Sequence, residues 1–180
     1  ANLVVNIEDR PLADVITCDI LLNQNYGAEQ LRYNTTGRVL LGAQYFMLRG
    51  DYLALDVSET RDVFDADAQS RNLEAGKFAR AMASARVIVC SAGCTAHEAL
   101  YLKKPTLLRL SAPNQSVAYE NLIADGYALP DNSDSEGRAR SDKAYISKVK
   151  NQNIIDGKSV ERVVDAILEE WEKKAWLRND

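Results

Sequence analysis

The chain has 180 residues, of which 46% are hydrophobic and 27% are charged, and its formal net charge is −4. This length suits one compact domain, and the composition is ordinary for a globular protein. The negative charge argues against a broad nucleic-acid surface or a patch for anionic membranes, but a few backbone N–H groups can still hold a small anion. No run approaches the ~20 apolar residues of a membrane-spanning helix, and the first residues show no secretory pattern, so no membrane span is predicted.

The three cysteines, Cys18, Cys90 and Cys94, form no disulfide framework, and we interpret them as free thiols of a cytoplasmic protein. The one histidine, His97, has no C-x-x-C pair beside it, so no metal site is predicted. Cys94 and His97 lie three residues apart, which allows a catalytic pair. Because no third group that would orient such a pair is evident, a small buried cysteine and a structural histidine are the favoured interpretation.

The first part of the chain alternates short apolar runs with polar exits. "NLVVNIED" predicts a strand with Asp9 at its carboxyl end, where Asp9 is a candidate base or a cap for the next segment. "CDILLNQNYGAEQ" predicts a buried strand over 20–22, and another strand is predicted over 38–41. Residues 54–72 are acidic and nearly without period, which is typical of a linker, a mobile loop or a junction.

The second part of the chain has stronger periodic patterns. Apolar runs alternate with helical spacing, which predicts an α/β fold with a Rossmann-like, mostly parallel sheet flanked by helices. The predicted elements are helices over 73–86, 95–102, 116–126 and 156–176, and strands over 87–90 and 106–110. The final helix repeats apolar residues from Val160 to Trp171 at helical spacing, and this stripe should lie against the sheet.

A turn of small residues joins the strand over 87–90 to the helix that follows it. Helix N–H groups lack partners at such a turn and the helix dipole is positive there, so a phosphate can approach the backbone. The predicted phosphate-binding residues are Ser91, Ala92, Gly93, Cys94 and Thr95. Gly93 permits a sharp bend. In the alternative interpretation, the small side chains only allow the helix to pack closely on the sheet.

Glu98 lies one turn into this helix and has two interpretations. Thr95-x-x-Glu98 fits a capping box, in which the Thr95 hydroxyl accepts the N–H of Glu98 and the carboxylate reaches back to Thr95. In the functional interpretation, the carboxylate accepts hydrogen bonds from two sugar hydroxyls, one turn beyond the phosphates.

The next strand ends at "SAPNQ", where Asn114 and Gln115 offer donors and acceptors to a polar ligand. Asn also favours turns and helix starts, so a loop without a ligand is the alternative. Two consecutive strands that end in small or polar residues over the same sheet edge favour a ligand site.

Several of these segments together resemble one family. "SAGCTAHEALYLKKPTLLRLSAPNQSVAYENLIADGYA" resembles the carboxyl-terminal donor-binding half of GT-B enzymes. "CDILLNQNYGAEQLRY" followed by "LLGAQYFMLRGDY" is similar to the UDP-sugar hydrolase of pseudaminic acid biosynthesis and to its spore-coat polysaccharide relatives. The resemblance covers residues 2–52 and 74–130. Those proteins release UDP from a 2,4-diacetamido-2,4,6-trideoxy sugar by attack of water at the anomeric carbon.

The resemblance implies roles for the residues singled out above. The turn from Ser91 to Thr95 would hold the diphosphate of UDP or a UDP-sugar, and Glu98 would bind the ribose hydroxyls. Asn114 and Gln115 would face the sugar or its phosphate. The residues that would border the cleft between the two halves are Asn23, Asn25 and Tyr26.

The resemblance also implies a division of the chain. Residues 1–53 would form the end of the amino-terminal half and a crossover segment, 54–72 a linker or junction, and 73–180 the nucleotide-sugar donor-binding domain. The family's glycine-rich loop with its histidine has no counterpart here, because His97 lies in the predicted donor-site helix, and no catalytic residue is assigned. A strand with a Gly-Gly turn, a helix and a further strand of the family are also missing. We therefore expect an incomplete GT-B carboxyl-terminal half, either a fragment or a truncated relative.

These features lead to a functional expectation. We expect the chain to bind UDP or a UDP-sugar without a cofactor and without turnover, while the parent protein is a UDP-sugar hydrolase. The alternatives are a UDP-sugar-dependent glycosyltransferase, a non-catalytic nucleotide-binding module and a plain structural domain.

Overall fold

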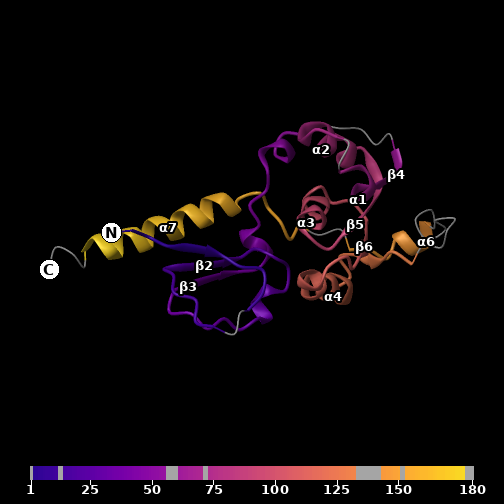
Figure 1. Ribbon diagram of the computed structural model, residues 1–180. Coiled ribbons are helices and arrows are strands. Elements are labelled where there is room, and N and C mark those ends of the chain that lie inside the picture. The colour runs from indigo at the N-terminus through magenta and orange to yellow at the C-terminus, as the bar shows by residue number, and fades with distance from the viewer. Residues whose placement is uncertain are drawn as a thin grey trace.

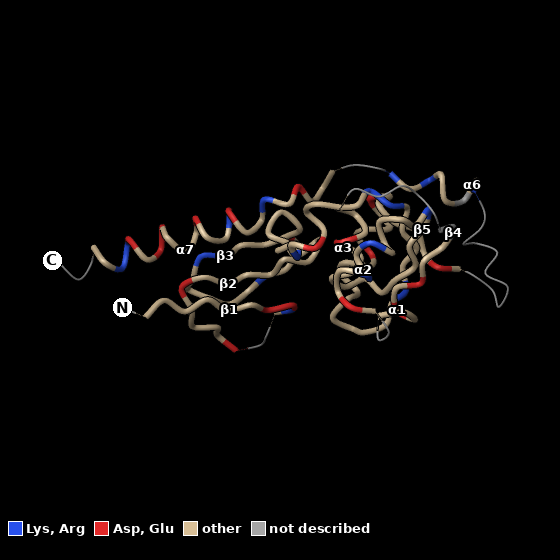
Figure 2. The backbone as a smooth tube through the Cα atoms, turned by 90° about the horizontal axis from the view of Figure 1, so that it is seen from above, with Lys and Arg blue, Asp and Glu red and all other residues tan. Residues whose placement is uncertain are grey.

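The computed structural model describes residues 2–11, 14–55, 61–70, 73–132, 143–150 and 153–176. The fold is α/β, as predicted, but it contains two sheets where the sequence predicted one. One sheet has three strands and the other has four, and every strand pair between described residues is parallel. Figures 1 and 2 show the three-stranded sheet on one side of the molecule and the four-stranded sheet with most helices on the other.

The three-stranded sheet is built from the first part of the chain. Its strands, in spatial order, are β1 (Val5–Ile7), β2 (Ile20–Asn23) and β3 (Arg38–Leu41). The helix α7 (Ser159–Trp176), from the other end of the sequence, packs across this sheet (Figure 1). Val163 and Ala166 of α7 contact a cluster that includes Ile20 and Leu22 of the central strand. Burial of this apolar surface joins the two ends of the described chain.

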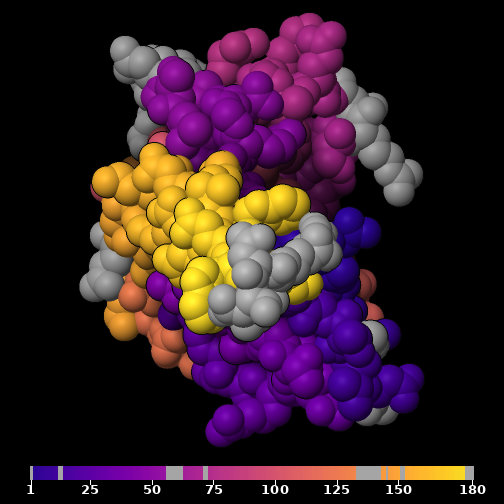
Figure 3. Space-filling view, turned by 90° about the vertical axis from the view of Figure 1, so that its left-hand side faces the viewer, coloured from indigo at the N-terminus to yellow at the C-terminus, as the bar shows by residue number. Residues whose placement is uncertain are grey.

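The orientation of α7 differs in part from the prediction. Val163 and Ile167 of the predicted stripe face the three-stranded sheet. The other stripe residues are exposed: Val160, Val164, Leu168 and Trp171. Figure 3 shows the surface of α7 on the side of the molecule that faces the viewer. Because Ala166 also packs on the sheet, the helix is rotated so that only one edge of the stripe is covered.

The four-stranded sheet is built from the second part of the chain. Its strands, in spatial order, are β4 (Arg61–Asp65), β5 (Ala85–Ser91), β6 (Thr106–Arg109) and β7 (Leu129–Pro130). The helices around it are α1 (Ala66–Gln69), α2 (Ala75–Ala83), α3 (Cys94–Tyr101), α4 (Ser116–Ala124) and α6 (Lys143–Ile146). The predicted helices and strands of this part are confirmed within a few residues. After α4, Gly126 takes a φ of 78°, which favours glycine and stops the helix.

Residues 54–72 contain regular structure that the sequence did not predict. Strand β4 and helix α1 lie within this range, and β4 pairs with β5 through Val63 and Phe64. The Phe64 side chain is fully buried. Only these two residues of β4 are apolar, so the strand carries too little pattern to be recognised, and it is stabilised by its place beside β5. The expected unpatterned linker is therefore corrected for 61–69, while 56–60 and 71–72 lie outside the described residues.

The segment that follows β3 packs into the core of the four-stranded sheet. Phe46, Leu48 and Tyr52 follow β3 in the sequence, yet they belong to the same buried cluster as Met82 of α2 and Ile88 of β5. The segment after β3 therefore fastens the first sheet to the second. Across the parts of the chain that the structure describes, none of the helices combines the length and hydropathy required to span a bilayer.

Candidate functional site

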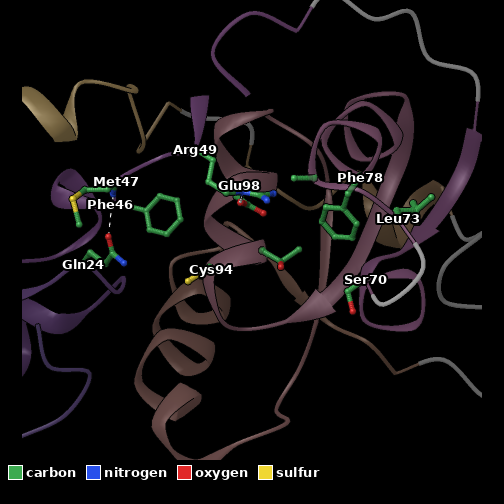
Figure 4. A pocket seen from close by; sticks show the side chains of 11 residues that line it. Gln24, Phe46, Met47, Arg49, Ser70, Leu73, Phe78, Cys94 and Glu98 are labelled. Atoms are coloured by element: carbon green, nitrogen blue, oxygen red, sulfur yellow. Dashed lines mark hydrogen bonds and ion pairs between the residues drawn. The ribbon is translucent and has the colours of Figure 1, made fainter. Parts of the chain in front are cut away.

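A cavity of about 460 Å³ opens where α3 begins, between the segment that follows β3 and helix α2 (Figure 4). Its walls come from four separate parts of the chain. The lining residues are Gln24, Phe46, Met47, Arg49, Ser70, Leu73, Ala75, Phe78, Cys94, Thr95 and Glu98. This volume is in the range of small-molecule sites, and the lining combines apolar side chains with a few polar ones, as such sites do. Of the predicted site residues, Cys94, Thr95 and Glu98 line this cavity.

Helix α3 presents its amino end to this cavity. Gly93 is the N-cap, so Cys94 and Thr95 are the first two helical residues. Their N–H groups have no intrahelical acceptor, and the positive end of the helix dipole lies beside them. Gly93 has a φ of −111°, an extended conformation open to other residues, so the bend does not depend on glycine as the sequence predicted.

The rest of the predicted phosphate-binding turn is already hydrogen-bonded within the protein. Asp67 of α1 accepts both the backbone N–H of Ser91, at 3.1 Å, and the Ser91 hydroxyl, at 2.9 Å. The N–H of Ala92 donates to the Arg109 carbonyl, and the N–H of Gly93 donates to the Ser91 carbonyl. The donors that this turn can offer to an anion are therefore the amides of Cys94 and Thr95.

An arginine and three carboxylates meet at the carboxyl edge of the four-stranded sheet. Arg109, at the end of β6, donates two hydrogen bonds to Asp65 and one to Asp131, and it lies 3.6 Å from Asp67. The hydrogen bonds that Arg109 donates to Asp65 raise the pKa of Arg109. Arg109 thus balances part of the negative charge that lies beside Ser91. The sequence analysis missed this network, since two of its acids lie in the segment expected to be a linker.

Glu98 is buried and does not form the predicted capping box. Its two carboxylate oxygens accept hydrogen bonds from Arg49 Nε, at 2.9 Å, and from the Tyr52 hydroxyl, at 2.8 Å. The N-cap of α3 is Gly93, which places Thr95 inside the helix, where its hydroxyl cannot act as the cap. Burial raises the pKa of Glu98, although the hydrogen bond from Tyr52 and the charge of Arg49 act in the opposite direction.

His97 is fully buried and connects the two sheets. Its Nε2 accepts the backbone N–H of Tyr26 at 2.9 Å, which leaves Nδ1 as the protonated nitrogen that donates to the Gly93 carbonyl at 3.0 Å. The ring also stacks on Phe46, with 4.7 Å between the ring centroids. Burial lowers the pKa of His97 to about 4, so the imidazole is neutral. This geometry matches the structural role that the sequence favoured, and the Cys94–His97 pair has no free imidazole nitrogen.

The predicted cleft residues lie where the first sheet faces the Asn114 loop. Asn25 and Asn114 each donate a side-chain hydrogen bond to the Asp9 carboxylate, at 3.1 and 3.3 Å. Asn23 is buried and donates to the Asp9 carbonyl, and the Tyr26 hydroxyl donates to Asp125 on the other side of the cleft. A second cavity, of about 250 Å³, adjoins this cluster and is lined by Glu8, Asp9, Arg10, Pro113 and Asn114.

Cys94 and Gln115 lie between the two cavities. The Cys94 side chain reaches solvent, but desolvation and the charges of Glu98 and Asp9 raise the pKa of its thiol. Gln115 accepts the backbone N–H of Ser111, and its side-chain amide lies beside Gly93. The structure thus brings most of the predicted residues together around the start of α3, while the Ser91 side chain is turned toward Asp67 and Ser111.

The sequence analysis missed most of the lining residues, and three of those missed are Gln24, Phe46 and Arg49. They occur within motifs quoted for the resemblance, but no local pattern distinguished them from structural residues. Among the described residues, no group of His, Cys, Asp or Glu side chains could hold a metal ion.

No protein-family model matches the sequence, and no curated protein is significantly similar to it.

Proposed function

We propose that the chain binds a nucleoside diphosphate sugar, with UDP in the cavity at the start of α3, and that the parent protein hydrolyses this UDP-sugar in the cytoplasm. The observation that carries the proposal is the position of the 460 Å³ cavity against the amides of Cys94 and Thr95, which have no acceptor within the helix. Backbone amides at a helix amino end are a common phosphate site, even in a protein with a net negative charge. The proposal therefore needs no broad basic surface.

The chemistry of the cavity walls fits a nucleotide. Phe46, Leu73 and Phe78 provide apolar surface for a base, and Gln24 lies at the same wall with an amide. The resemblance implies that Glu98 binds the ribose hydroxyls. Each of its oxygens has accepted one hydrogen bond from the protein and has further lone-pair capacity.

The second cavity is the proposed site for the sugar. This cavity is lined by Asn114, which follows β6, whereas the nucleotide cavity is lined by Glu98. Cys94 lies near both cavities, because the charges of Asp9 and Glu98 both raise the pKa of its thiol. A diphosphate at Cys94 would therefore direct the sugar toward Asp9 and Asn114. Asp9 is the carboxylate of this cavity that we propose to activate the attacking water.

A non-catalytic nucleotide-binding module is the second candidate, and one observation favours it. His97 is the one imidazole of the sequence, and both of its nitrogens are hydrogen-bonded within the core. It cannot accept a proton from water in this state. Binding without turnover by this chain alone is thus the expected behaviour, and hydrolysis belongs to the parent protein.

Two substitutions at one position test the binding proposal. Cys94→Pro removes a backbone N–H at the first helical position, where proline is well tolerated. Cys94→Ala removes the same thiol and keeps the N–H. We expect UDP to bind the Cys94→Ala variant about as tightly as the wild type and the Cys94→Pro variant about tenfold more weakly, the loss of roughly one hydrogen bond to a charged group. Isothermal titration calorimetry with UDP measures both, and equal affinities for the two variants would refute a phosphate at this amide.

A further inference from the structure

Arg49 lies at the wall of the nucleotide cavity in an unusual arrangement (Figure 4). Its Nε donates to Glu98, its Nη2 donates to the Tyr52 hydroxyl, and its guanidinium lies 5.2 Å from the centroid of the Tyr52 ring. The structure gives Nη1 no acceptor among the described residues. Two of the three guanidinium nitrogens are thus used to fix the orientation of the group, and the third remains available.

The two members of this ion pair differ strongly in exposure. The Glu98 side chain is 6% exposed, whereas the Arg49 side chain is 44% exposed. The carboxylate therefore lies behind the guanidinium, and the positive group faces the open side. Because a partly buried ion pair adds little net stability over apolar packing, stability alone is a weak reason for this arrangement.

The charges around the cavity indicate which kind of ligand Arg49 would bind. Among the described residues that line the cavity, Arg49 is the one cation and Glu98 the one carboxylate. An anion that entered beside Cys94 and Thr95 would meet a bare carboxylate if Arg49 were absent. With Arg49 in place, the charge of the carboxylate is balanced, and the N–H groups of Nη1 remain to donate charge-assisted hydrogen bonds to phosphate oxygens.

We infer that Arg49 is the side chain that binds the diphosphate, and that Glu98 and Tyr52 are positioning residues that hold its guanidinium toward the α3 amides. The inference rests on the proposed nucleotide site, and it specifies the ligand class: a diphosphate is recognised over a nucleoside. Two parts of the chain, Arg49 after β3 and the amides at the start of α3, hold the same group from different sides. The main contribution of Glu98 to affinity is then made through Arg49.

Titrations of UDP, UMP and uridine, followed by NMR chemical-shift changes, test this inference. For Arg49→Gln we expect the affinity for UDP to fall about 10- to 100-fold, the affinity for UMP to fall less, and the affinity for uridine to stay unchanged. Arg49→Lys keeps the charge without the planar fork and should lose an intermediate amount. Arg38→Gln, at the opposite end of β3 and paired with Glu169, is the matched control and should bind UDP as the wild type does.

Glu98→Gln separates positioning from direct contact with ribose. If Glu98 acts through Arg49, this variant loses affinity for UDP while its affinity for uridine is retained. An equal loss for UDP and uridine would overturn the positioning role, because it would place the ribose on the carboxylate. Wild-type affinity for UDP in Arg49→Gln would overturn the role of Arg49 and leave the nucleotide site intact. Failure of the wild type to bind UDP at millimolar concentration would overturn the proposed function itself.

Discussion

The stability of this protein should depend on pH through His97. The folded state holds the imidazole neutral, and burial lowers its pKa to about 4 from an ordinary value of 6.5. The unfolded chain therefore binds more protons than the folded chain between these two pH values, and stability falls as pH decreases through this window. Above pH 6.5 the contribution is fully present.

The magnitude follows from the two pKa values of His97. The complete shift corresponds to roughly 3 kcal/mol, and about 2 kcal/mol of this is lost between pH 7.5 and pH 5.0. Carboxylates also begin to titrate near pH 5, so the effect of His97 must be separated from theirs. His97→Gln achieves this, because the sequence has no other histidine and the glutamine oxygen can still accept the Tyr26 N–H.

Urea unfolding at the two pH values measures the effect. We expect the wild type to lose about 2 kcal/mol more than His97→Gln when the pH is lowered from 7.5 to 5.0. The variant itself should be less stable at pH 7.5, which does not affect this difference. Equal losses in the two proteins would refute the reasoning, as would an NMR titration in which the His97 ring protons change with a midpoint near 6.5.

Three further predictions concern other parts of the structure. Tyr52→Phe removes the hydroxyl that donates to the buried Glu98 carboxylate and should cost about 1–3 kcal/mol in urea unfolding; an unchanged unfolding midpoint would contradict this contact. Val163→Ala, in the interface between α7 and the first sheet, should cost roughly 2 kcal/mol, whereas Val160→Ala on the exposed face should cost less than about 0.5 kcal/mol. An alkylating reagent should modify one thiol per native chain, that of Cys94, while the two buried thiols react only in denaturant, and UDP should slow the native reaction. Mass spectrometry identifies the labelled thiol, and labelling of Cys18 or Cys90 in the native chain would contradict this prediction.

The elements with strong periodicity could be predicted from the sequence, and strand β4 could not. Strand β5 carries a run of buried apolar residues that needs no context to be recognised. Strand β4 has only Val63 and Phe64, and the acids around them gave the segment the composition of a linker. Its acids are neutralised by Arg109, which lies more than forty residues further along the chain. The local composition around Asp65 therefore cannot indicate its contact with Arg109.

The role of Glu98 was obscured for a related reason. The spacing from Thr95 to Glu98 fits a capping box, but the helix begins at Cys94 with Gly93 as its cap, so the pattern lies two residues too far into the helix. The partners that determine the position of the carboxylate are Arg49 and Tyr52, from the segment after β3. Local spacing can indicate a helix cap, whereas the ion pair between Arg49 and Glu98 forms only when the two parts of the chain pack together.

The same docking also explains why the candidate site should respond to conditions that weaken the boundary between the sheets. Arg49 reaches Glu98 from the first part of the chain, and the Tyr26 N–H reaches His97 on the same short helix. These two contacts come from consecutive residues of α3, so the helix that offers its amides to the cavity is held from two sides. Protonation of His97 would remove the acceptor for Tyr26 and weaken one of these attachments. The inferred phosphate site requires Arg49 and the α3 amides to face each other. Affinity for UDP should therefore fall along with stability as His97 becomes charged. This loss of affinity should occur without protonation of any group that contacts the ligand.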